Sequence, residues 1–398
     1  PVLRDGSRGK ATLGAVIDTA MIAGSIAVIG YLFLEHEYVL TRFAYVDALK
    51  PIDAFLGVTI IVLVLESTRR IVGLALPITA LLFLAYGIFA ANLRPGELID
   101  QMYLTTEGIF GIPLNVSATY LVLFIVFGSL VEKSGTGKLF MDFALALAGH
   151  TAGGPAKVAC MTSAMFGTIS GSSTANVMTT GTFTIPMMKK IGYRPAFAGA
   201  VEAVASTGGQ IMPPIMGATA FVMAEFMAVS YLTVIGIAIL PALLYFLAVF
   251  VAVHFEAKRI GLKGLPRADL PEMGRVLRDR GHQFLPLVVI VAILVAGYSA
   301  PYAATLGLLS VIPVTLMRKS TRHEMSIRLI YEAIIDGIRN SLQVATATAC
   351  SGIVIGIISL SGIGIEFTTF VIQLSQDTLL LALILTAFAG IILGMGLP

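Results

Sequence analysis

Oxygen-bearing side chains gather in one short, glycine-rich stretch of the sequence. Residues 167–176 read GTISGSSTAN and include the hydroxyl and amide oxygens of Ser170, Ser172, Ser173, Thr174 and Asn176. Hydroxyl and carbonyl oxygens coordinate hard cations such as Na⁺, and free helix N-termini attract carboxylates. This composition therefore indicates a site for an ion or an organic anion. The alternative, that small residues only allow helices to pack closely, remains open.

A second stretch that could bind a ligand is residues 208–214, which read GGQIMPP. Proline lacks a backbone N–H and glycine weakens helices, so a continuous helix is disfavoured here. The break leaves backbone carbonyls near Gly208, Gly209 and Gln210 without helical partners. We predict that these carbonyls join the oxygens of residues 167–176 in one site.

One carboxylate precedes this break. Glu202 lies about two helical turns after Arg194 in an otherwise apolar stretch. An acidic side chain within a membrane span is usually functional, unless a nearby cation neutralises it. Both interpretations are kept: a functional carboxylate, or an ion pair with an interfacial lysine.

Composition sets the environment of these residues. Of 398 residues, 57% are hydrophobic and 12% are charged, and the mean hydropathy is +0.91. Soluble domains carry about 25% charged residues, so a soluble enzyme, a disordered protein and a nucleic-acid-binding protein are excluded. We predict an all-α polytopic membrane protein in which Cys160 and Cys350 are small buried hydrophobic residues. No nucleotide-binding motif is visible, which disfavours an ATP-driven pump.

Apolar length and charge predict the topology. Bilayer-spanning helices need about 20 apolar residues, and the candidate spans are 13–34, 51–67, 71–91, 112–131, 231–253, 284–300, 302–317 and 341–360. Lys and Arg mark the cytoplasmic side, which places residues 257–283 inside and the uncharged turn at 300–301 outside. Residues 323–340 are amphipathic and predict a helix on the inner surface.

Charged side chains in the flanks have simpler explanations. Glu66 is expected to form a local ion pair with Arg69 and Arg70, and Asp18 to lie at a helix interface. The histidines show no metal-ligand spacing, so His254, His282 and His323 are expected to be solvated.

Two regions do not fit simple spans. Residues 153–188 have basic flanks, and two arms of about 15 residues reach only about 22 Å, short of a full crossing. We predict a re-entrant helical hairpin with its tip in residues 167–176. Residues 195–227 are predicted to form a discontinuous helix, because irregular backbone at that depth needs protein or a water-filled cavity around it.

The sequence also contains an internal repeat. Residues 134–140 (SGTGKLF) resemble 361–367 (SGIGIEF), and 166–171 (FGTISG) resemble 389–394 (AGIILG) in the same order. The charge pattern makes the second copy enter from the opposite side, so the repeats are predicted to be inverted, as in many secondary transporters. Residues 394–398 then form the tip of a second hairpin. We expect the chain to be part of a longer polypeptide that continues beyond this tip.

Four motifs together resemble a known family. Residues 105–113 (TTEGIFGIP), 167–172 (GTISGS), 205–214 (ASTGGQIMPP) and 394–398 (GMGLP) are similar to the fused membrane permease of tripartite ATP-independent periplasmic (TRAP) transporters. The similarity is greatest to the branch whose binding protein is called TAXI, and it covers nearly the whole chain. It implies Na⁺-driven uptake of an organic anion, usually a carboxylate, by an elevator motion.

The resemblance also implies a division of the chain. Residues 1–104 would be small-subunit-like scaffold helices, and 105–256 the first transport repeat. Residues 257–283 would be a cytoplasmic linker, and 284–398 scaffold helices with the start of the second repeat.

The same resemblance assigns residues to roles. Na⁺ would be bound by the first tip, the break and the second tip: Ser170, Gly171, Ser172, Ser173, Gly208, Gly209, Pro213, Gly394 and Gly396. Substrate would be bound by Thr174, Asn176, Gln210 and Met395. No other metal and no cofactor is expected.

The sequence therefore predicts a non-enzymatic permease in the cytoplasmic (inner) membrane of a bacterium or archaeon. Its expected partners are a TAXI-type periplasmic binding protein, a small organic anion and membrane lipid, with neither nucleic acid nor ATP. Two alternatives remain: a stand-alone Na⁺/carboxylate symporter of similar architecture, and a channel or scaffold subunit that does not transport.

Overall fold

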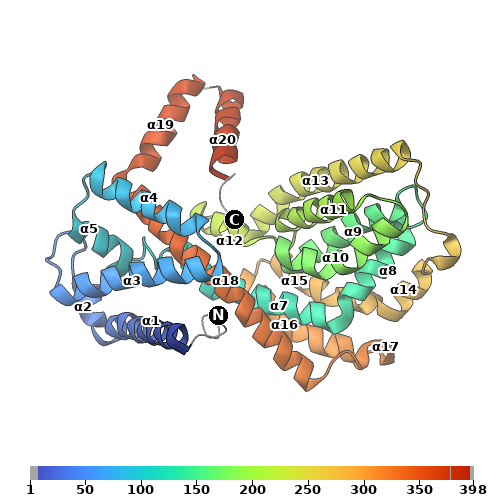
Figure 1. Ribbon diagram of the computed structural model, residues 1–398, viewed down its shortest axis with the longest axis horizontal. Coiled ribbons are helices and arrows are strands. Elements are labelled where there is room, and N and C mark those ends of the chain that lie inside the picture. Colours follow the sequence, from blue (N-terminus) through green and yellow to red (C-terminus); the bar gives the residue numbers. More distant parts are fainter. Residues whose placement is uncertain (1–7, 377, 395–398) are drawn as a thin grey trace. The chain divides into compact units, whose positions relative to one another are not determined.

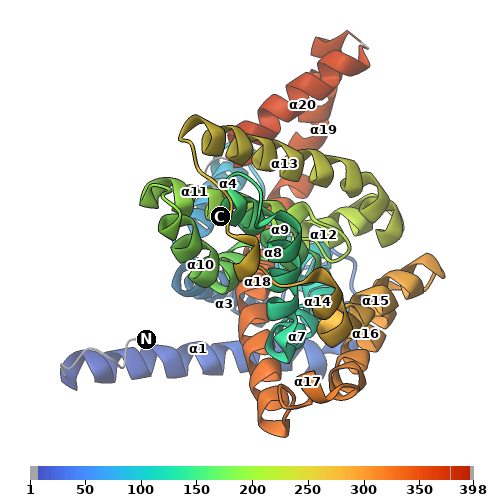
Figure 2. The same cartoon turned by 90° about the vertical axis from the view of Figure 1, so that its right-hand side faces the viewer.

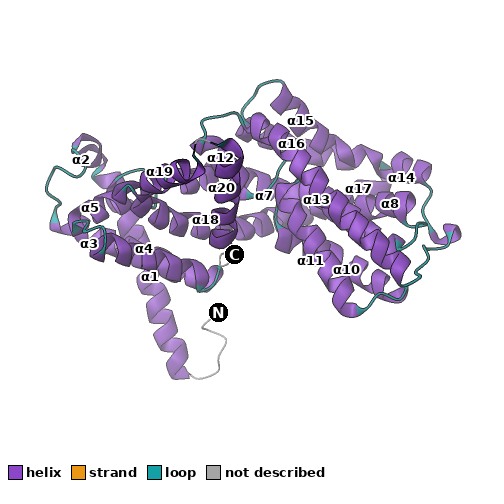
Figure 3. Cartoon of the chain, turned by 90° about the horizontal axis from the view of Figure 1, so that it is seen from above, coloured by secondary structure: helices purple, strands orange, loops and turns teal. Residues whose placement is uncertain are grey.

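The computed structural model describes residues 8–376 and 378–394, and within these ranges the chain is helical without any strand (Figure 3). The predicted all-α fold is confirmed. Five described helices are long and apolar enough to cross a membrane: Gly14–Leu34, Pro51–Ile71, Ile112–Ala148, Tyr231–Arg259 and Ile327–Ser361. The chain divides into two compact units, one formed by residues 1–115 and 342–398 and the other by residues 116–341.

The first unit contains the N-terminal helices and the end of the chain. Its elements are α1 (Arg8–Leu34), α2 (His36–Thr41), α3 (Pro51–Ile71), α4 (Ala75–Phe89), α5 (Pro95–Ile99), a π-helical turn η2 (Asp100–Leu104), α19 (Ile363–Ser375) and α20 (Leu379–Gly394). A buried core of Ala80, Met102, Tyr103, Ile353 and Ile357 joins the early helices to the second half of α18 (Ile327–Ser361). Residues far apart in sequence are thus packed together in this unit.

Ionic contacts hold α1 against α3. Arg69 Nε and Arg70 Nε lie 2.7 and 2.6 Å from the Glu66 carboxylate, and Arg70 also pairs with Asp18 on α1. The predicted local pair of Glu66 is confirmed, and Asp18 lies at a helix interface as expected.

The second unit contains the helical hairpin and the broken helix. A helical run starts with α6 (Ile112–Val116), most of which belongs to the first unit, and continues in the second unit as η3 (Ser117–Leu121), α7 (Val122–Val131), η4 (Glu132–Thr136) and α8 (Gly137–Ala148). The second unit continues with α9 (Gly154–Ser170), α10 (Ser173–Lys190), α11 (Pro195–Gly208), η5 (Gly209–Ile211), α12 (Ala218–Phe226) and α13 (Tyr231–Arg259). Helices α9, α10 and α11 pack against one another (Figure 1).

The remaining elements of this unit follow the basic segment. They are η6 (Arg267–Asp269), α14 (Met273–Arg280), η7 (Gly281–Phe284), α15 (Leu285–Val295), α16 (Ala300–Leu316), α17 (Lys319–Arg322) and the first part of α18, up to Ser341. Helices α15 and α16 form an antiparallel pair (Figure 2). With 11 residues, α15 is about 16 Å long, shorter than the predicted span over residues 284–300.

Exposed apolar side chains mark a surface that suits lipid. On α13, Ile237, Leu240, Leu244 and Leu247 all expose more than half of their surface. A continuous apolar stripe of this kind on a helix of 29 residues is unfavourable in water and favourable in a bilayer.

Helix α18 differs from its prediction. The structure has one continuous helix, Ile327–Ser361, of 35 residues where the sequence predicted a surface helix at 323–340 followed by a separate span. Neither proline nor glycine pairs interrupt the junction at Asn340 and Ser341, so the hydrogen-bond ladder continues through it.

The basic segment is partly packed, which corrects the prediction for one histidine. His282 is 9% exposed, not solvated, and its Nε2 lies 3.0 Å from Thr321 Oγ1. Next to it, Arg280 pairs with Glu324 at 2.7 Å, and Gln283 Nε2 donates to the Ser134 carbonyl at 2.7 Å. These contacts bury the turn η7 that precedes α15.

The repeated motifs share a backbone conformation. Gly135 and Gly362, the matching glycines of the two SGxG motifs, have φ values of 82° and 73°. The helix after each motif has similar length, 12 residues in α8 and 13 in α19. A left-handed residue favours glycine, so the repeated glycine has the same physical cause in both copies. Both cysteines are buried and free, as predicted.

Candidate functional site

The tip of the hairpin is set by a glycine and a serine. Gly171 ends α9 with a φ of 58°, a conformation that residues with a side chain rarely adopt. Ser172 begins α10 as its N-cap, and its Oγ accepts a hydrogen bond from Ala175 N at 3.3 Å. The chain thus reverses within two residues, and the end of α9 lies beside the start of α10.

The break in the second element has a different cause. After Gly208, a short 3₁₀ turn (Gly209–Ile211) leads into Pro213 and Pro214, whose missing N–H groups prevent further helix. The Gly217 N–H donates to the Gln210 carbonyl at 2.7 Å, so the irregular segment folds back before α12 begins.

The tip and the break touch each other through glycines. A Cβ added to Gly171 would lie 1.7 Å from the Met216 carbonyl oxygen, and one on Gly167 would lie 2.4 Å from Gly209 Cα. Any side chain at either position would separate the two segments. One polar side-chain contact also joins them, because Gln210 Nε2 donates to Ser173 Oγ at 3.1 Å.

The structure therefore brings the predicted residues of the first tip and the break together. Exposure differs among them: Ser172, Thr174 and Gln210 are exposed, Ser170, Ser173 and Pro213 are half-buried, and Gly171, Asn176, Gly208 and Gly209 are buried. Asn176 Nδ2 donates to the Ser163 carbonyl at 2.8 Å, which fixes its amide inside the hairpin.

The second predicted tip is described only up to Gly394, the last residue of α20. Met395 and Gly396 lie outside the described residues. Helix α20 has 16 residues, and α9, its counterpart in the repeat, has 17.

The chemistry of the joined segments suits a monovalent cation. Residues 166–176 and 205–217 contain no charged side chain, so their ligands would be neutral hydroxyl, amide and carbonyl oxygens. Sites for divalent cations such as Ca²⁺ usually add several carboxylates. Neutral oxygens with two helix ends can hold one positive charge or orient a carboxylate.

Deeper in the bundle, Glu202 lies among hydroxyl groups. Its side chain is fully buried at 0% exposure. Thr184 Oγ1 lies 2.5 Å from Glu202 Oε2, while Ser206 Oγ and Ser163 Oγ lie 3.3 and 3.4 Å from Oε1. Thr180 Oγ1 also donates to Oε1. All residues of this unit are described, and no ion pair includes Glu202, so the proposed pairing with a lysine is wrong.

Sequence reasoning found Glu202 but missed its hydroxyl partners. The available signal was helical spacing: Asn176, Thr180 and Thr184 follow one another at four-residue intervals on α10, and Ser206 follows Glu202 by four on α11. Such residues share one helix face. The sequence alone does not show that these faces of α10 and α11 pack against each other.

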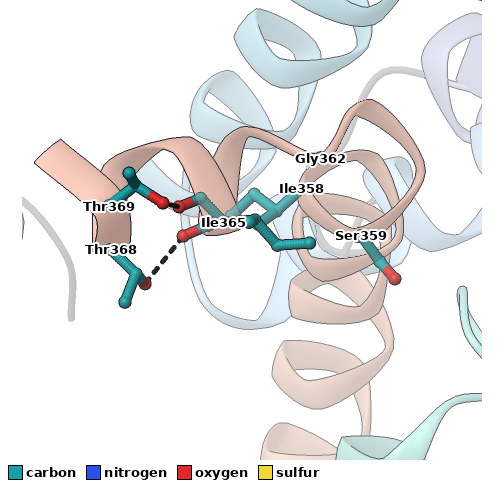
Figure 4. A pocket seen from close by; sticks show the side chains of 7 residues that line it. Ile358, Ser359, Gly362, Ile365, Thr368 and Thr369 are labelled. Carbon is teal, nitrogen blue, oxygen red and sulfur yellow. Dashed lines mark hydrogen bonds between the residues drawn. The ribbon is translucent and has the colours of Figure 1, made fainter.

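A surface pocket of about 410 Å³ lies where α18 meets α19 in the first unit (Figure 4). Its threonine hydroxyls already form hydrogen bonds within α19: Thr368 Oγ1 donates to the Gly364 carbonyl and Thr369 Oγ1 to the Ile365 carbonyl. The pocket offers few free polar groups, and we do not assign it to the site.

Residues 59–398 match the profile of a transporter family, the tripartite ATP-independent periplasmic transporter, DctM component. The chain belongs to this family. The match includes the hairpin, the break and α18 to α20. It begins inside α3, within the segment 1–104 predicted to resemble the small subunit.

Individual DctM-family relatives match shorter stretches. The C4-dicarboxylate TRAP transporter large permease protein of Pseudomonas aeruginosa is 30% identical over 181 residues, which are 46% of this chain and 42% of the relative. The sialic acid TRAP transporter large permease protein of Vibrio cholerae is 27% identical over 190 residues, 48% and 44% of the two chains. The ectoine/5-hydroxyectoine TRAP transporter large permease protein of Ruegeria pomeroyi is 27% identical over 157 residues, 39% and 36% of the two chains. The matches thus span less than half the length of these relatives.

Proposed function

We propose that the chain is the permease of a Na⁺-coupled secondary transporter that imports an organic anion delivered by a periplasmic binding protein. The observation that carries this proposal is the direct contact between the hairpin tip and the helix break, where Gly171 meets Met216 and Gly167 meets Gly209. Family membership supports the transport function, since the related chains are named as permeases.

The proposed ion is Na⁺ because the joined segments offer only neutral oxygens. Ser170, Ser172 and Ser173 provide hydroxyls at the tip, and the end of α11 provides carbonyls near Gly208 and Gly209. In broken-helix transporters such groups coordinate the coupling ion, while half-helix N-termini bind substrate carboxylates. We assign Thr174, Asn176 and Gln210 to the substrate side, together with Met395 of the second tip.

The proposed substrate is a carboxylate of small size. Two relatives are named for C4-dicarboxylates and sialic acid, and a third is named for ectoine/5-hydroxyectoine. These names differ enough that the substrate must be found by experiment. We further propose a TAXI-type binding protein, a small-subunit-like role for residues 1–104, an elevator motion and a location in the inner membrane.

The test is uptake by the full-length permease in proteoliposomes with its binding protein and a labelled panel of C4-dicarboxylates, sialic acid and ectoine. We expect saturable uptake that needs both an inward Na⁺ gradient and the binding protein. Uptake that is indifferent to replacing Na⁺ by K⁺ would refute the coupling. Uptake without the binding protein would support a stand-alone symporter, and flux that does not saturate would support a channel.

The ion-site assignment has its own test. A Cβ on Gly209 would lie 3.0 Å from both Asn176 Nδ2 and Gly167 Cα, so Gly209→Val should force the tip and the break apart. We expect a Na⁺ half-saturation concentration raised about tenfold or more, equivalent to about 1.4 kcal/mol of lost binding. Ser172→Leu should act in the same direction. Unchanged Na⁺ affinity in both variants would remove these residues from the ion site.

A further inference from the structure

We propose that Glu202 and the four hydroxyls around it form a reversible proton-binding site, distinct from the site at the tip and the break. The carboxyl group would bind one proton on Oε2 and release it to water, changing its charge from −1 to 0 without breaking another bond. The hydroxyls belong to Ser163 on α9, Thr180 and Thr184 on α10, and Ser206 on α11.

The first reason is that the carboxylate has no cation to balance it. A fully buried carboxylate without a paired charge is unfavourable, and binding a proton removes that charge. Ion pairs of the same unit join other residues, such as Lys133 with Asp336 and Arg280 with Glu324.

None of the charged or titratable groups on the neighbouring helices forms an ion pair or a hydrogen bond with Glu202. On α9, Lys157 Nζ donates to Thr151 Oγ1 at 3.0 Å, and Cys160 is a buried free thiol. On α13, Tyr245 donates to the Val204 carbonyl at 2.7 Å. The other groups on the elements packed here are Lys189 and Lys190 at the end of α10, Tyr193 and Arg194 before α11, and Tyr231, His254, Glu256, Lys258 and Arg259 on α13.

The second reason is that the hydroxyls can serve both charge states. Thr184 Oγ1 lies 2.5 Å from Glu202 Oε2 and 3.0 Å from the Thr180 carbonyl oxygen, but a hydroxyl has one hydrogen to donate. When Glu202 is ionised, that hydrogen points to Oε2. When Glu202 is protonated, Oε2–H donates to Thr184 Oγ1, whose hydrogen turns to the Thr180 carbonyl. The heavy atoms keep their places.

The site is connected to the tip through Asn176. Thr180 Oγ1 lies 2.8 Å from the Asn176 carbonyl and 3.3 Å from Asn176 Oδ1, in addition to its bond to Glu202. The Asn176 amide faces Gly209, and Glu202 precedes Gly208 by about 9 Å along α11. A negative charge at Glu202 should therefore favour a cation at the tip and the break. This coupling rests on the proposed Na⁺ site, whereas the proton site does not.

Infrared difference spectroscopy between low and high pH tests proton binding without any transport assay. We expect a carboxylic C=O band that appears as the pH falls and is missing in Glu202→Gln. Glutamine keeps the shape, donating to Thr184 and accepting from Thr180, so the variant should fold. Glu225→Gln is the matched control, because Glu225 is an exposed carboxylate on α12 bonded to Tyr120, and it should leave the band unchanged.

The outcomes are decisive in both directions. A band that is absent at every pH, present at every pH, or retained in Glu202→Gln would overturn the proposal. If Glu202→Gln does not fold, Thr184→Val keeps the carboxyl group and removes its hydroxyl partner. The band should then shift in frequency, and an unshifted band would assign it to another group.

The coupling to Na⁺ is measured separately in proteoliposomes. We expect the Na⁺ half-saturation concentration to rise about fivefold on acidification, a typical size for coupled sites. Glu202→Gln should show the higher concentration at every pH. Na⁺-dependent uptake without any pH effect would refute the coupling, and uptake without any Na⁺ dependence would refute the proposed function instead.

Discussion

At the scale of single residues, glycines decide whether the tip can meet the break. Gly171 combines a left-handed φ of 58° with a Cβ position 1.7 Å from the Met216 oxygen. Alanine there should cost about 1–2 kcal/mol for the backbone alone, and the clash adds to this. We expect Gly171→Ala to lower the thermal midpoint in detergent and to reduce the stabilisation given by Na⁺.

The matched control for this variant is Gly199→Ala. Gly199 lies inside α11 with no atom within 4 Å of its Cβ position. Alanine in a helix interior is better than glycine by about 0.5–1 kcal/mol, so the control should be as stable as the parent or slightly more stable. Equal midpoints for both variants would contradict the close contact at the tip.

At the same scale, the burial of His282 should make the stability of the folded chain depend on pH. Burial, helped by the nearby Arg318 and Arg280 charges, lowers the pKa of His282 below its ordinary value of about 6.5. Its Nδ1 is buried without a partner, so a charged ring would leave a donor unsatisfied. As the pH falls below about 6.5, the unfolded chain takes up a proton that the folded chain does not, and stability is lost.

We therefore expect the thermal midpoint to fall between about pH 8 and about pH 5.5, and His282→Gln to reduce that fall. His323→Gln, which removes an exposed histidine, should leave the pH dependence as it is. If the two variants respond alike to pH, burial of His282 does not contribute to the acid sensitivity.

At the scale of elements, sequence patterns predicted the hairpin and the broken helix but not what surrounds Glu202. Gly171, Pro213 and Pro214 act on their own backbone, so their effect can be recognised without the fold. The partners of Glu202 come from three helices, and a single sequence does not specify which faces of α9, α10 and α11 meet. For the same reason the sequence did not predict the burial of His282, which depends on contact with Thr321.

Helix α18 shows a second limit of sequence patterns. Charged residues in 323–340 and apolar residues in 341–360 indicate two environments, yet a change of environment does not require a break in the helix. Only a residue such as proline or a glycine pair would interrupt the backbone hydrogen bonds. The amphipathic half and the apolar half therefore belong to one continuous helix in the structure.

This continuity can be tested with a helix breaker at Asn340, an exposed residue in the middle of α18. Asn340→Pro should cost about 3 kcal/mol or more, because it removes a helical hydrogen bond and clashes with the preceding turn. Asn340→Ala is the control and should be neutral or slightly stabilising. Chemical unfolding in detergent micelles measures both, and a proline variant as stable as the alanine variant would mean that the helix is interrupted there.

At the scale of the whole molecule, the predicted inversion of the repeat is the feature that alternating access would require. The SGxG motifs share left-handed glycines at 135 and 362, and the helices after them have similar lengths. The charge pattern predicts opposite orientations for the two copies, since Lys189 and Lys190 at the end of the first hairpin are expected on the cytoplasmic side. The second hairpin should then begin outside, near Thr378.

Cysteine accessibility distinguishes inverted from parallel copies. Cys160 and Cys350 are buried, so the parent chain should react little with a membrane-impermeant maleimide. Lys189 and Thr378 are both exposed in the structure. We expect Thr378→Cys in the full-length permease to be labelled in intact cells, from the periplasmic side. Lys189→Cys should be labelled only after the membrane has been permeabilised. Labelling of both cysteines from the same side would mean that both hairpins enter the membrane from that side. The repeats would then be parallel, and alternating access through inverted hairpins would be excluded.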